Sequence, residues 1–256
     1  MLSFIADALP MLHDDAMTRS AAPSAPRTAR ERVRRELTDE IKAVALAQIA
    51  AGGGSALSLR AIAREMGMAS SALFRYFPNR DALLTALIID TYGALADAAE
   101  AAEARVHTLP VGERWMAICH AVHDWAVFHP HEYALIFGSP IPGYAAPQDT
   151  IGPASRVPML LGGLLVDLAV VQAEAGAAPV TVPPDVERAL QPLYTTIPPQ
   201  VPADLLVRGL MGWTYLFGAV SFEVFGHRHN VVDDHEVFFD HEIRRLGSLL
   251  GYDAGP

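Results

Sequence analysis

Cysteine is nearly absent from this chain of 256 residues, because Cys119 is its single example. One thiol excludes an intramolecular disulfide and a zinc site built from several cysteines. This usage is typical of a cytoplasmic protein, and we expect that location. Residues 1–11 are apolar, but Asp7 and Pro10 interrupt them and no basic residue precedes them, so they do not predict a signal peptide.

Motifs of common enzymes and metal sites are also missing. HE dipeptides begin at His131, His235 and His241, but none has a histidine four positions on, so there is no HExxH motif. The glycines at 52–54 match neither a dinucleotide nor a Walker motif, and no GxSxG elbow occurs. His120 and His123 share a predicted helix face. With a third ligand they could bind a metal ion, and the alternative is that both imidazoles are packed or exposed to solvent. We predict no catalytic residue, metal or cofactor.

The longest nearly uncharged stretch is residues 209–226, where Glu223 is the one formal charge. A spanning helix needs about 20 residues, and a carboxylate inside hydrocarbon is costly. A helix buried against both its own domain and a partner subunit has the same composition. We therefore expect no membrane segment, with a membrane-associated helical protein as an alternative.

Basic residues are outnumbered by acidic ones, 19 to 29, and the formal net charge is −10. The distribution is uneven, however. Between Arg27 and Arg80 there are ten basic and five acidic residues, whereas the rest of the chain has nine basic and 24 acidic ones. A basic module on an acidic protein indicates where a polyanion would bind.

Residues 58–81, SLRAIAREMGMASSALFRYFPNRD, form the most informative stretch. Its first part has the apolar spacing of a short helix at Leu59, Ile62, Ala63 and Met66. Ser58 is placed to cap that helix, and Gly67 ends it. A second helix begins near Ala69 or Ser70, directs Leu73 and Phe77 to the same core, and stops before Pro78. Helix, glycine turn and helix make a helix-turn-helix pattern.

The outward face of the second helix has the chemistry of a DNA reader. Small and hydroxylated residues let a helix approach the floor of the major groove, and this face carries Ser70, Ser71, Phe74 and Arg75. Flanking groups suited to phosphate contacts are Arg60, Tyr76 and Arg80. The alternative is an ordinary helical hairpin with solvated arginines, since helix pairs with a glycine turn are common.

The segments IAREMG, MASSALFRYF and PNRDALL resemble the DNA-binding domain of the TetR family of transcriptional regulators. The resemblance covers roughly residues 30–85. It implies that base edges are read at Ala69, Ser70, Ser71 and Ala72, and that phosphates are gripped at Ser58, Phe74, Tyr76 and Arg80. Two positions depart from the family. Phe74 stands where tyrosine is usual, which removes a phosphate hydrogen bond, and Ala69 stands where a capping serine is frequent, which shifts the expected cap to Ser70.

The remaining sequence predicts an all-α protein. We expect helices over about 30–51, 79–106, 112–128, 131–137, 154–175, 185–194, 203–225 and 233–250, separated by proline and glycine loops. Residues 1–26 are expected to be a flexible arm, with Met1 or Met17 as the true start. Residues 27–80 would form a three-helix helix-turn-helix domain, and residues 81–256 a larger helical domain for ligand binding and dimerisation.

The helix over 203–225 is apolar on several faces, and one domain core covers only one of them. A two-fold copy covering the other gives a four-helix interface. In the TetR family the last two helices commonly form the dimer interface, and WTYLFGAVSFEVFGH from Trp213 to His227 resembles one group of its C-terminal domains. The resemblance therefore implies a homodimer through the last two helices.

Large apolar residues from several helices also predict a ligand cavity with few polar groups. The candidate lining residues are Trp115, Cys119, Val122, His123, Tyr133, Phe137, Met159, Trp213 and Phe217. A filled core with the same residues is the alternative.

The combined expectation is a ligand-responsive transcriptional regulator that binds DNA as a homodimer. By resemblance it is a repressor released from a palindromic operator by an apolar or aromatic small molecule. An α-helical small-molecule-binding protein or enzyme with a DNA-binding-like module remains an alternative. The effector, the operator and the regulated genes are not predicted.

Overall fold

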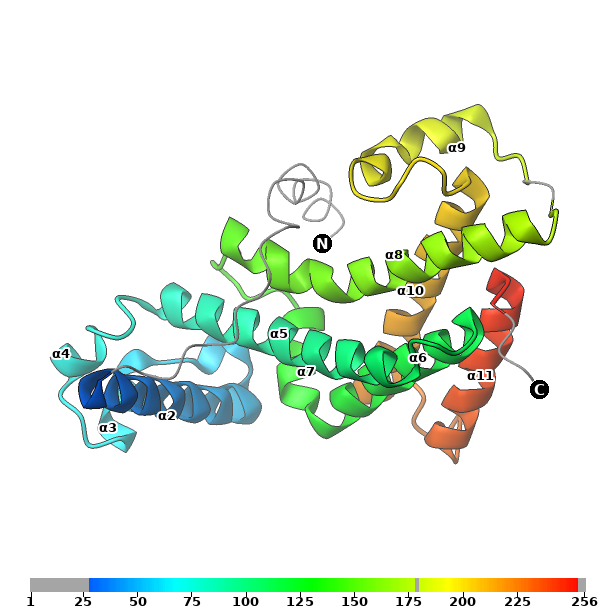
Figure 1. Ribbon diagram of the computed structural model, residues 1–256. Helices are drawn as coiled ribbons and strands as arrows, with labels where there is room; N and C mark the ends of the chain where they lie inside the picture. The colour runs from blue at the N-terminus through cyan, green and yellow to red at the C-terminus, as the bar shows by residue number, and fades with distance from the viewer. Residues whose placement is uncertain (1–27, 178–179, 253–256) are drawn as a thin grey trace. The chain divides into compact units, whose positions relative to one another are not determined.

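The computed structural model describes residues 28–177 and 180–252, and these residues contain helices and loops but no strand. Figure 1 labels the elements. They are α2 Ala29–Gly52, η2 Gly54–Ala56, α3 Leu59–Glu65, α4 Ser70–Leu73, α5 Arg80–Val106, α6 Val111–Phe128, α7 Pro130–Phe137, η3 Gln148–Thr150, α8 Ile151–Glu174, α9 Pro184–Ala189, η4 Gln191–Thr195, α10 Ala203–Val224 and α11 His235–Leu250. The all-α prediction is confirmed. The expected arm, residues 1–26, lies outside the described residues.

The chain divides into two compact units. The described part of the amino-terminal unit is residues 28–92 and 129–150, and that of the carboxyl-terminal unit is residues 93–128, 151–177 and 180–252. The long helix α5 contributes its first turns to the amino-terminal unit and its later turns to the carboxyl-terminal unit.

The amino-terminal unit is built on one apolar core. Its fully buried members include Ile41 and Ala45 of α2, Ile62 of α3, Leu73 of α4 and Leu83 of α5. The helical spacing of these residues places them on the inner faces of their helices.

Local capping fixes where the helices of this unit begin. Thr28 and Glu31 form a reciprocal capping box at the start of α2, which the sequence reading missed although the TxxE pattern is visible. The Asn79 side chain accepts from the Ala82 amide at 2.8 Å and caps the start of α5, the helix that was expected to begin near residue 79.

The helix-turn-helix begins as predicted, because Ser58 Oγ accepts from the Ala61 amide at 3.3 Å and caps α3. Gly67 follows α3 with a φ of +64°, a left-handed conformation that glycine adopts without a Cβ clash. The prediction for the next cap was wrong. Ala69 is the N-cap residue of α4 and makes no side-chain bond, while its carbonyl accepts from the Ala72 amide at 2.8 Å. The helix can start here on backbone bonding alone.

The second helix is also shorter than predicted. α4 has regular geometry over four residues, after which Tyr76 and Phe77 bond back to the Leu73 carbonyl in successive turns. These turns keep Phe77 in the core, so the apolar spacing was read correctly although the helix ends early.

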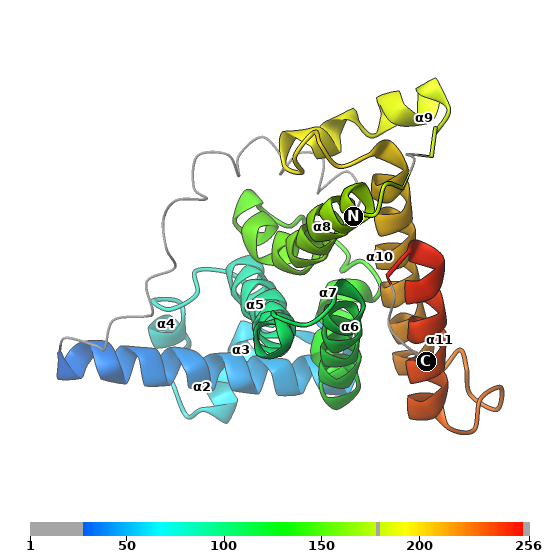
Figure 2. The ribbon, with the colours of Figure 1, turned by 45° about the vertical axis from the view of Figure 1, so that its right-hand side comes forward.

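The carboxyl-terminal unit packs α6 against α8, α10 and α11. The inner face of α6 buries Trp115, Ile118, Cys119, Val122 and Ala126, which recur at helical spacing. Figure 2 shows α10 and α11 side by side, and their residues are in extensive contact.

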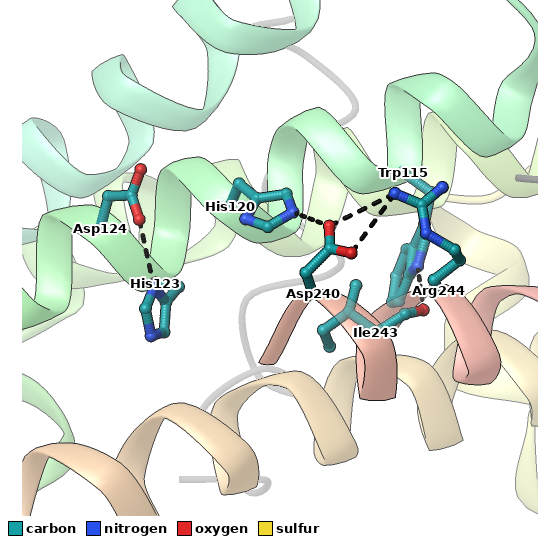
Figure 3. Close-up of polar contacts among 7 residues, drawn as sticks. All are labelled: Trp115, His120, His123, Asp124, Asp240, Ile243 and Arg244. Carbon is teal, nitrogen blue, oxygen red and sulfur yellow. Dashed lines mark hydrogen bonds and ion pairs between the residues drawn. The ribbon is translucent and has the colours of Figure 1, made fainter. Parts of the chain in front are cut away.

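Trp115 fixes α11 to α6. Its Nε1 donates to the Ile243 carbonyl at 3.2 Å, and a Cβ on Gly247 would lie 3.0 Å from the indole, so glycine at this position allows the ring to pack closely. Figure 3 shows this bond together with a second contact, in which His120 Nε2 lies 3.0 Å from Asp240 Oδ1. Apolar fit and polar contacts together set the register of the two helices.

Three helical stretches are long and apolar enough to span a membrane by length and composition, namely Arg80–Val106, Gln148–Glu174 and Ala203–Val224. All three supply buried side chains to the cores of this protein. Ion pairs also involve each of them, including Arg156 of α8 with Glu100 of α5 and Arg208 with Asp204 of α10. Internal packing accounts for part of their hydropathy, and Ala203–Val224 also carries apolar side chains that are exposed, such as Met211 and Phe222.

Candidate nucleic-acid interface and internal cavity

The face of α4 and its following turn that points away from the core is polar and accessible. Ser70, Ser71 and Arg75 are exposed, and the Phe74 ring is 43% exposed. Ala69 is exposed and Ala72 half-buried, so the residues expected to read bases lie together at the start of this helix. Figure 1 shows α4 in the same unit as α2 and α3.

The predicted phosphate contacts flank that face. Ser58 and Arg60 are exposed at the start of α3, and the Ser58 hydroxyl retains its own proton for donation while it caps the helix. Tyr76 is half-buried, and the Arg34 guanidinium lies 5.9 Å from the centre of its ring. Arg34 comes from the basic start of α2, so this contact joins that segment to the helix-turn-helix.

Arg80, a predicted phosphate contact, is bonded within its own unit. Its Nη2 donates to the Gly54 carbonyl at 2.8 Å, and its Nη1 lies 3.7 Å from Asp81. The bond connects the start of α5 to the loop before α3. If Arg80 also binds phosphate, it does so either with its remaining N–H groups or by giving up the bond to the Gly54 carbonyl.

The carboxyl-terminal unit contains an apolar cavity of about 270 Å³. Its wall comes from α6, α8, α9, η4, α10 and the end of α11. Trp115, Met159 and Trp213, three of the nine residues predicted for a cavity, line it. Most of the lining residues were not predicted. They include Leu190, Pro192, Leu193, Thr196 and Ile197, which lie between α9 and α10.

The other six candidates lie elsewhere. Cys119, Val122 and Phe217 are buried in the packing of the carboxyl-terminal unit but do not line the cavity, and Tyr133 and Phe137 belong to α7 in the amino-terminal unit. These positions carry the same apolar pattern as a true lining residue, so sequence alone could not separate the two.

His123 is held by polar partners and does not reach the cavity. Its Nε2 lies 3.0 Å from Glu223 Oε2 and its Nδ1 3.1 Å from Asp124 Oδ1, while its ring stacks on Phe239 at 4.1 Å. Figure 3 shows His120 and His123 engaged with separate carboxylates. Within the described residues, no three His, Cys, Asp or Glu side chains are grouped so as to hold a metal ion.

An apolar stripe runs along the outward face of α10. It has helical spacing and comprises Val207, Met211, Thr214, Gly218 and Phe222. Met211 is 59% exposed and Phe222 is 55% exposed. On α11 the neighbouring exposed apolar residues are Val237, Phe238 and Leu249. By contrast, Leu216 of α10 is fully buried and belongs to the core.

The later turns of α5 are held by two arginines through three carboxylates on one face. Arg114 of α6 donates Nε to Glu103 Oε1 at 2.7 Å and Nη1 to Asp167 Oδ2 of α8 at 2.6 Å. Burial alone would raise the pKa of Glu103, but the bonds from His107 and Arg114 outweigh it and lower that pKa. Arg156 of α8 donates to the other two carboxylates of α5, which are Asp97 and Glu100.

Comparison with known proteins extends the match beyond the helix-turn-helix. Residues 41–87 match the family of bacterial regulatory proteins described as the tetR family, and residues 115–246 match the tetracyclin repressor-like C-terminal domain. The HTH-type transcriptional regulator Rv1816 of Mycobacterium tuberculosis is 36% identical over 241 residues, 87% of this chain and 97% of the relative. The regulator Mb1846 of Mycobacterium bovis matches with the same figures.

Solved structures agree. The regulatory protein SCO4313 is 34% identical with a TM-score of 0.71, and the match covers 86% of this chain and 98% of that one. A protein of unknown function from Rhodococcus sp. RHA1 shares the fold, with a TM-score of 0.57 at 21% identity, over 90% of this chain and 97% of that one. Similarity therefore extends over both compact units.

Proposed function

This chain belongs to the TetR family of bacterial transcriptional regulators, and from that premise we propose that it binds duplex DNA through the outward face of α4. One observation carries the proposal. Leu73 and Phe77 fix this segment to the core, which leaves Ser70, Ser71 and Arg75 exposed on the opposite side. A short polar helix held rigidly by its neighbour is what entry into a major groove requires.

We propose that residues 27–80 bind DNA and that residues 81–256 bind the effector and form the dimer. Ala69 to Ala72 would lie nearest the base edges. Ser58, Arg60 and Tyr76 would contact phosphates, with Phe74 contributing apolar contact only. Arg80 would act mainly through the Gly54 carbonyl, by holding the loop before α3 in place.

A second copy of the chain is the proposed partner of the α10 stripe. Exposure of Met211 and Phe222 to water is unfavourable, and the small residues Thr214 and Gly218 between them permit close approach of another helix. A two-fold axis beside α10 and α11 would join two helices from each protomer. Two recognition helices related by that axis favour a palindromic operator.

The cavity is the proposed effector site. It is apolar and lies in the same unit as the α10 stripe. Residues 158–165 of α8 form one of its walls. Arg156 and Asp167, which connect α8 to α5 and α6, flank that wall in sequence. A ligand that displaces α8 would therefore also displace α5, whose first turns belong to the DNA-binding unit. A coupling of about 1–3 kcal/mol is enough for release from DNA.

We infer repression as the sign of regulation, because ligand-induced release is the family's usual behaviour. The protein would work in the cytoplasm, which its similarity to bacterial transcriptional regulators supports.

Selection from a random duplex pool tests the function. Purified protein should enrich an inverted repeat at low ionic strength, because a two-fold dimer places two equal recognition surfaces on the duplex. Failure to enrich any sequence, with and without small molecules, would remove the DNA-binding proposal.

A further inference from the structure

The cavity wall contains no side chain that carries a full charge near neutral pH. None of the described residues that line it is Lys, Arg, His, Asp or Glu. An ion buried without a partner is strongly disfavoured relative to water, whereas apolar surface is favoured. The wall therefore selects against carboxylates, phosphates and ammonium groups.

The charged group beside the wall is already engaged. Arg208 donates Nη1 to the carbonyl of Leu250, a lining residue, at 2.7 Å, and Nη2 to Asp204 Oδ2 at 2.7 Å. Its positive charge is already balanced by Asp204, which is itself buried. Arg208 consequently supplies no free positive charge to the site.

Few neutral hydrogen-bonding groups remain. The Trp115 indole nitrogen is committed to the Ile243 carbonyl. Thr196 lines the cavity, and its hydroxyl oxygen is shielded from solvent without a hydrogen-bond partner. Buried polar atoms without partners are uncommon and costly, and rotation about Cα–Cβ changes whether the hydroxyl or the methyl group of a threonine faces a cavity. Thr196 can therefore satisfy its hydroxyl by turning it toward a ligand.

Aromatic surface forms another part of the wall. Trp115 and Tyr252 stack with ring centres 5.3 Å apart, and Trp213 lines the same cavity. Burial raises the pKa of Tyr252, so its phenol stays uncharged near neutral pH. With about 270 Å³ available, the space is slightly below the usual range for drug-sized ligands.

We propose that the effector is a small, uncharged, mainly apolar molecule with one hydrogen-bonding group that pairs with the Thr196 hydroxyl. This inference rests on the proposed ligand-responsive function and specifies its ligand class. A hydroxyl or carbonyl attached to a ring system or short hydrocarbon meets the requirements, whereas an organic acid or amine does not.

Three probes of similar size separate these requirements: 2-naphthol, naphthalene and 2-naphthoate. Titration calorimetry of the full-length protein should show binding of 2-naphthol and naphthalene, with 2-naphthoate at least about a hundredfold weaker because its charge has no partner in the wall. Binding of 2-naphthoate as tight as that of 2-naphthol, or no binding of any probe, would overturn the proposal.

Thr196→Val tests the hydrogen bond with almost no change of shape. We expect affinity for 2-naphthol to fall about three- to tenfold and affinity for naphthalene to be unchanged. Equal losses for both probes would assign Thr196 a purely structural role. As a site control, Gly162→Phe should abolish binding of both neutral probes, since Gly162 lines the cavity beside Ile197.

DNA binding is measured separately on the same preparations. A protein that selects an inverted repeat but binds none of the probes keeps the proposed function and loses this inference. A protein that binds 2-naphthol as described but selects no DNA loses the proposed function while the cavity assignment stands.

Discussion

Arg156 of α8 holds Glu100 of α5 through two hydrogen bonds, from Nε to Oε1 at 2.9 Å and from Nη2 to Oε2 at 2.6 Å. The same guanidinium reaches Asp97 at 2.6 Å and the Gly93 carbonyl at 3.3 Å. A fork-to-fork pair fixes direction as well as distance. This contact gives α8, which lines the cavity, a defined attachment to α5.

Arg156→Met should loosen that attachment. We expect faster amide exchange in α5 residues 93–106, and a free energy of unfolding lower by only about 1 kcal/mol, because the carboxylates are substantially exposed. Arg156→Lys is the matched control, since it keeps the charge and loses the fork. Unchanged amide exchange in α5 of Arg156→Met would show that the contact with α8 does not stabilise α5, and would contradict the proposed route of coupling.

Acid should weaken the neighbouring buried pair. The pKa of Glu103 lies below its ordinary value of 4.5, so Glu103 stabilises the fold above that pH and the stabilisation is lost as the pH falls through the folded pKa. Glu103→Gln should lower the free energy of unfolding by about 2 kcal/mol at neutral pH. The difference in this free energy between the variant and the natural protein should become smaller below pH 4.5.

Urea unfolding followed by tryptophan fluorescence measures this difference, because all three tryptophans lie in the carboxyl-terminal unit. A gap that is constant from neutral to acidic pH would show that the bonds from Arg114 and His107 do not depend on the Glu103 charge.

Arg60→Ala should weaken binding to every duplex by a similar factor and reduce the slope of log affinity against log salt by about one, because a single phosphate contact is lost. Fluorescence anisotropy over a salt series measures both quantities. Arg188→Ala on α9 is the control, since Arg188 is also exposed but lies in the carboxyl-terminal unit. Equal slopes for the two variants would remove Arg60 from the interface.

Phe222→Asp should convert the proposed dimer to monomer, because it places a charge on the apolar α10 stripe. Size-exclusion chromatography with light scattering gives the mass directly. Val171→Asp is the control at an exposed apolar site on α8, and it should leave the dimer intact. A fully dimeric Phe222→Asp protein would place the interface elsewhere.

Local features were the ones that sequence predicted well. The caps at Ser58 and Asn79 depend on residues three positions apart, and the core residues Leu73 and Phe77 follow from helical spacing. Ala69 shows the limit of this approach, because backbone bonding started α4 without the side-chain cap that was expected.

The cavity depends on packing between distant segments and was predicted poorly. Cys119 and Trp115 lie on one stripe of α6, yet only Trp115 lines the cavity, since the position of α8 and the end of α11 decides which surface is left open. Leu193 lies near the end of the helix predicted over 185–194 and Thr196 follows that helix, and no local pattern at either position distinguishes a cavity wall from an ordinary surface.

Photo-crosslinking tests the central claim, that the outward face of α4 meets DNA, most directly. Phe74 is an exposed aromatic residue, so benzoylphenylalanine can replace it with little disturbance, and Phe128, 80% exposed in the carboxyl-terminal unit, provides the matched control. On the selected inverted repeat, position 74 should crosslink to DNA and position 128 should not. Crosslinking from position 128 alone, with none from position 74 in a protein that still binds the duplex, would contradict the account.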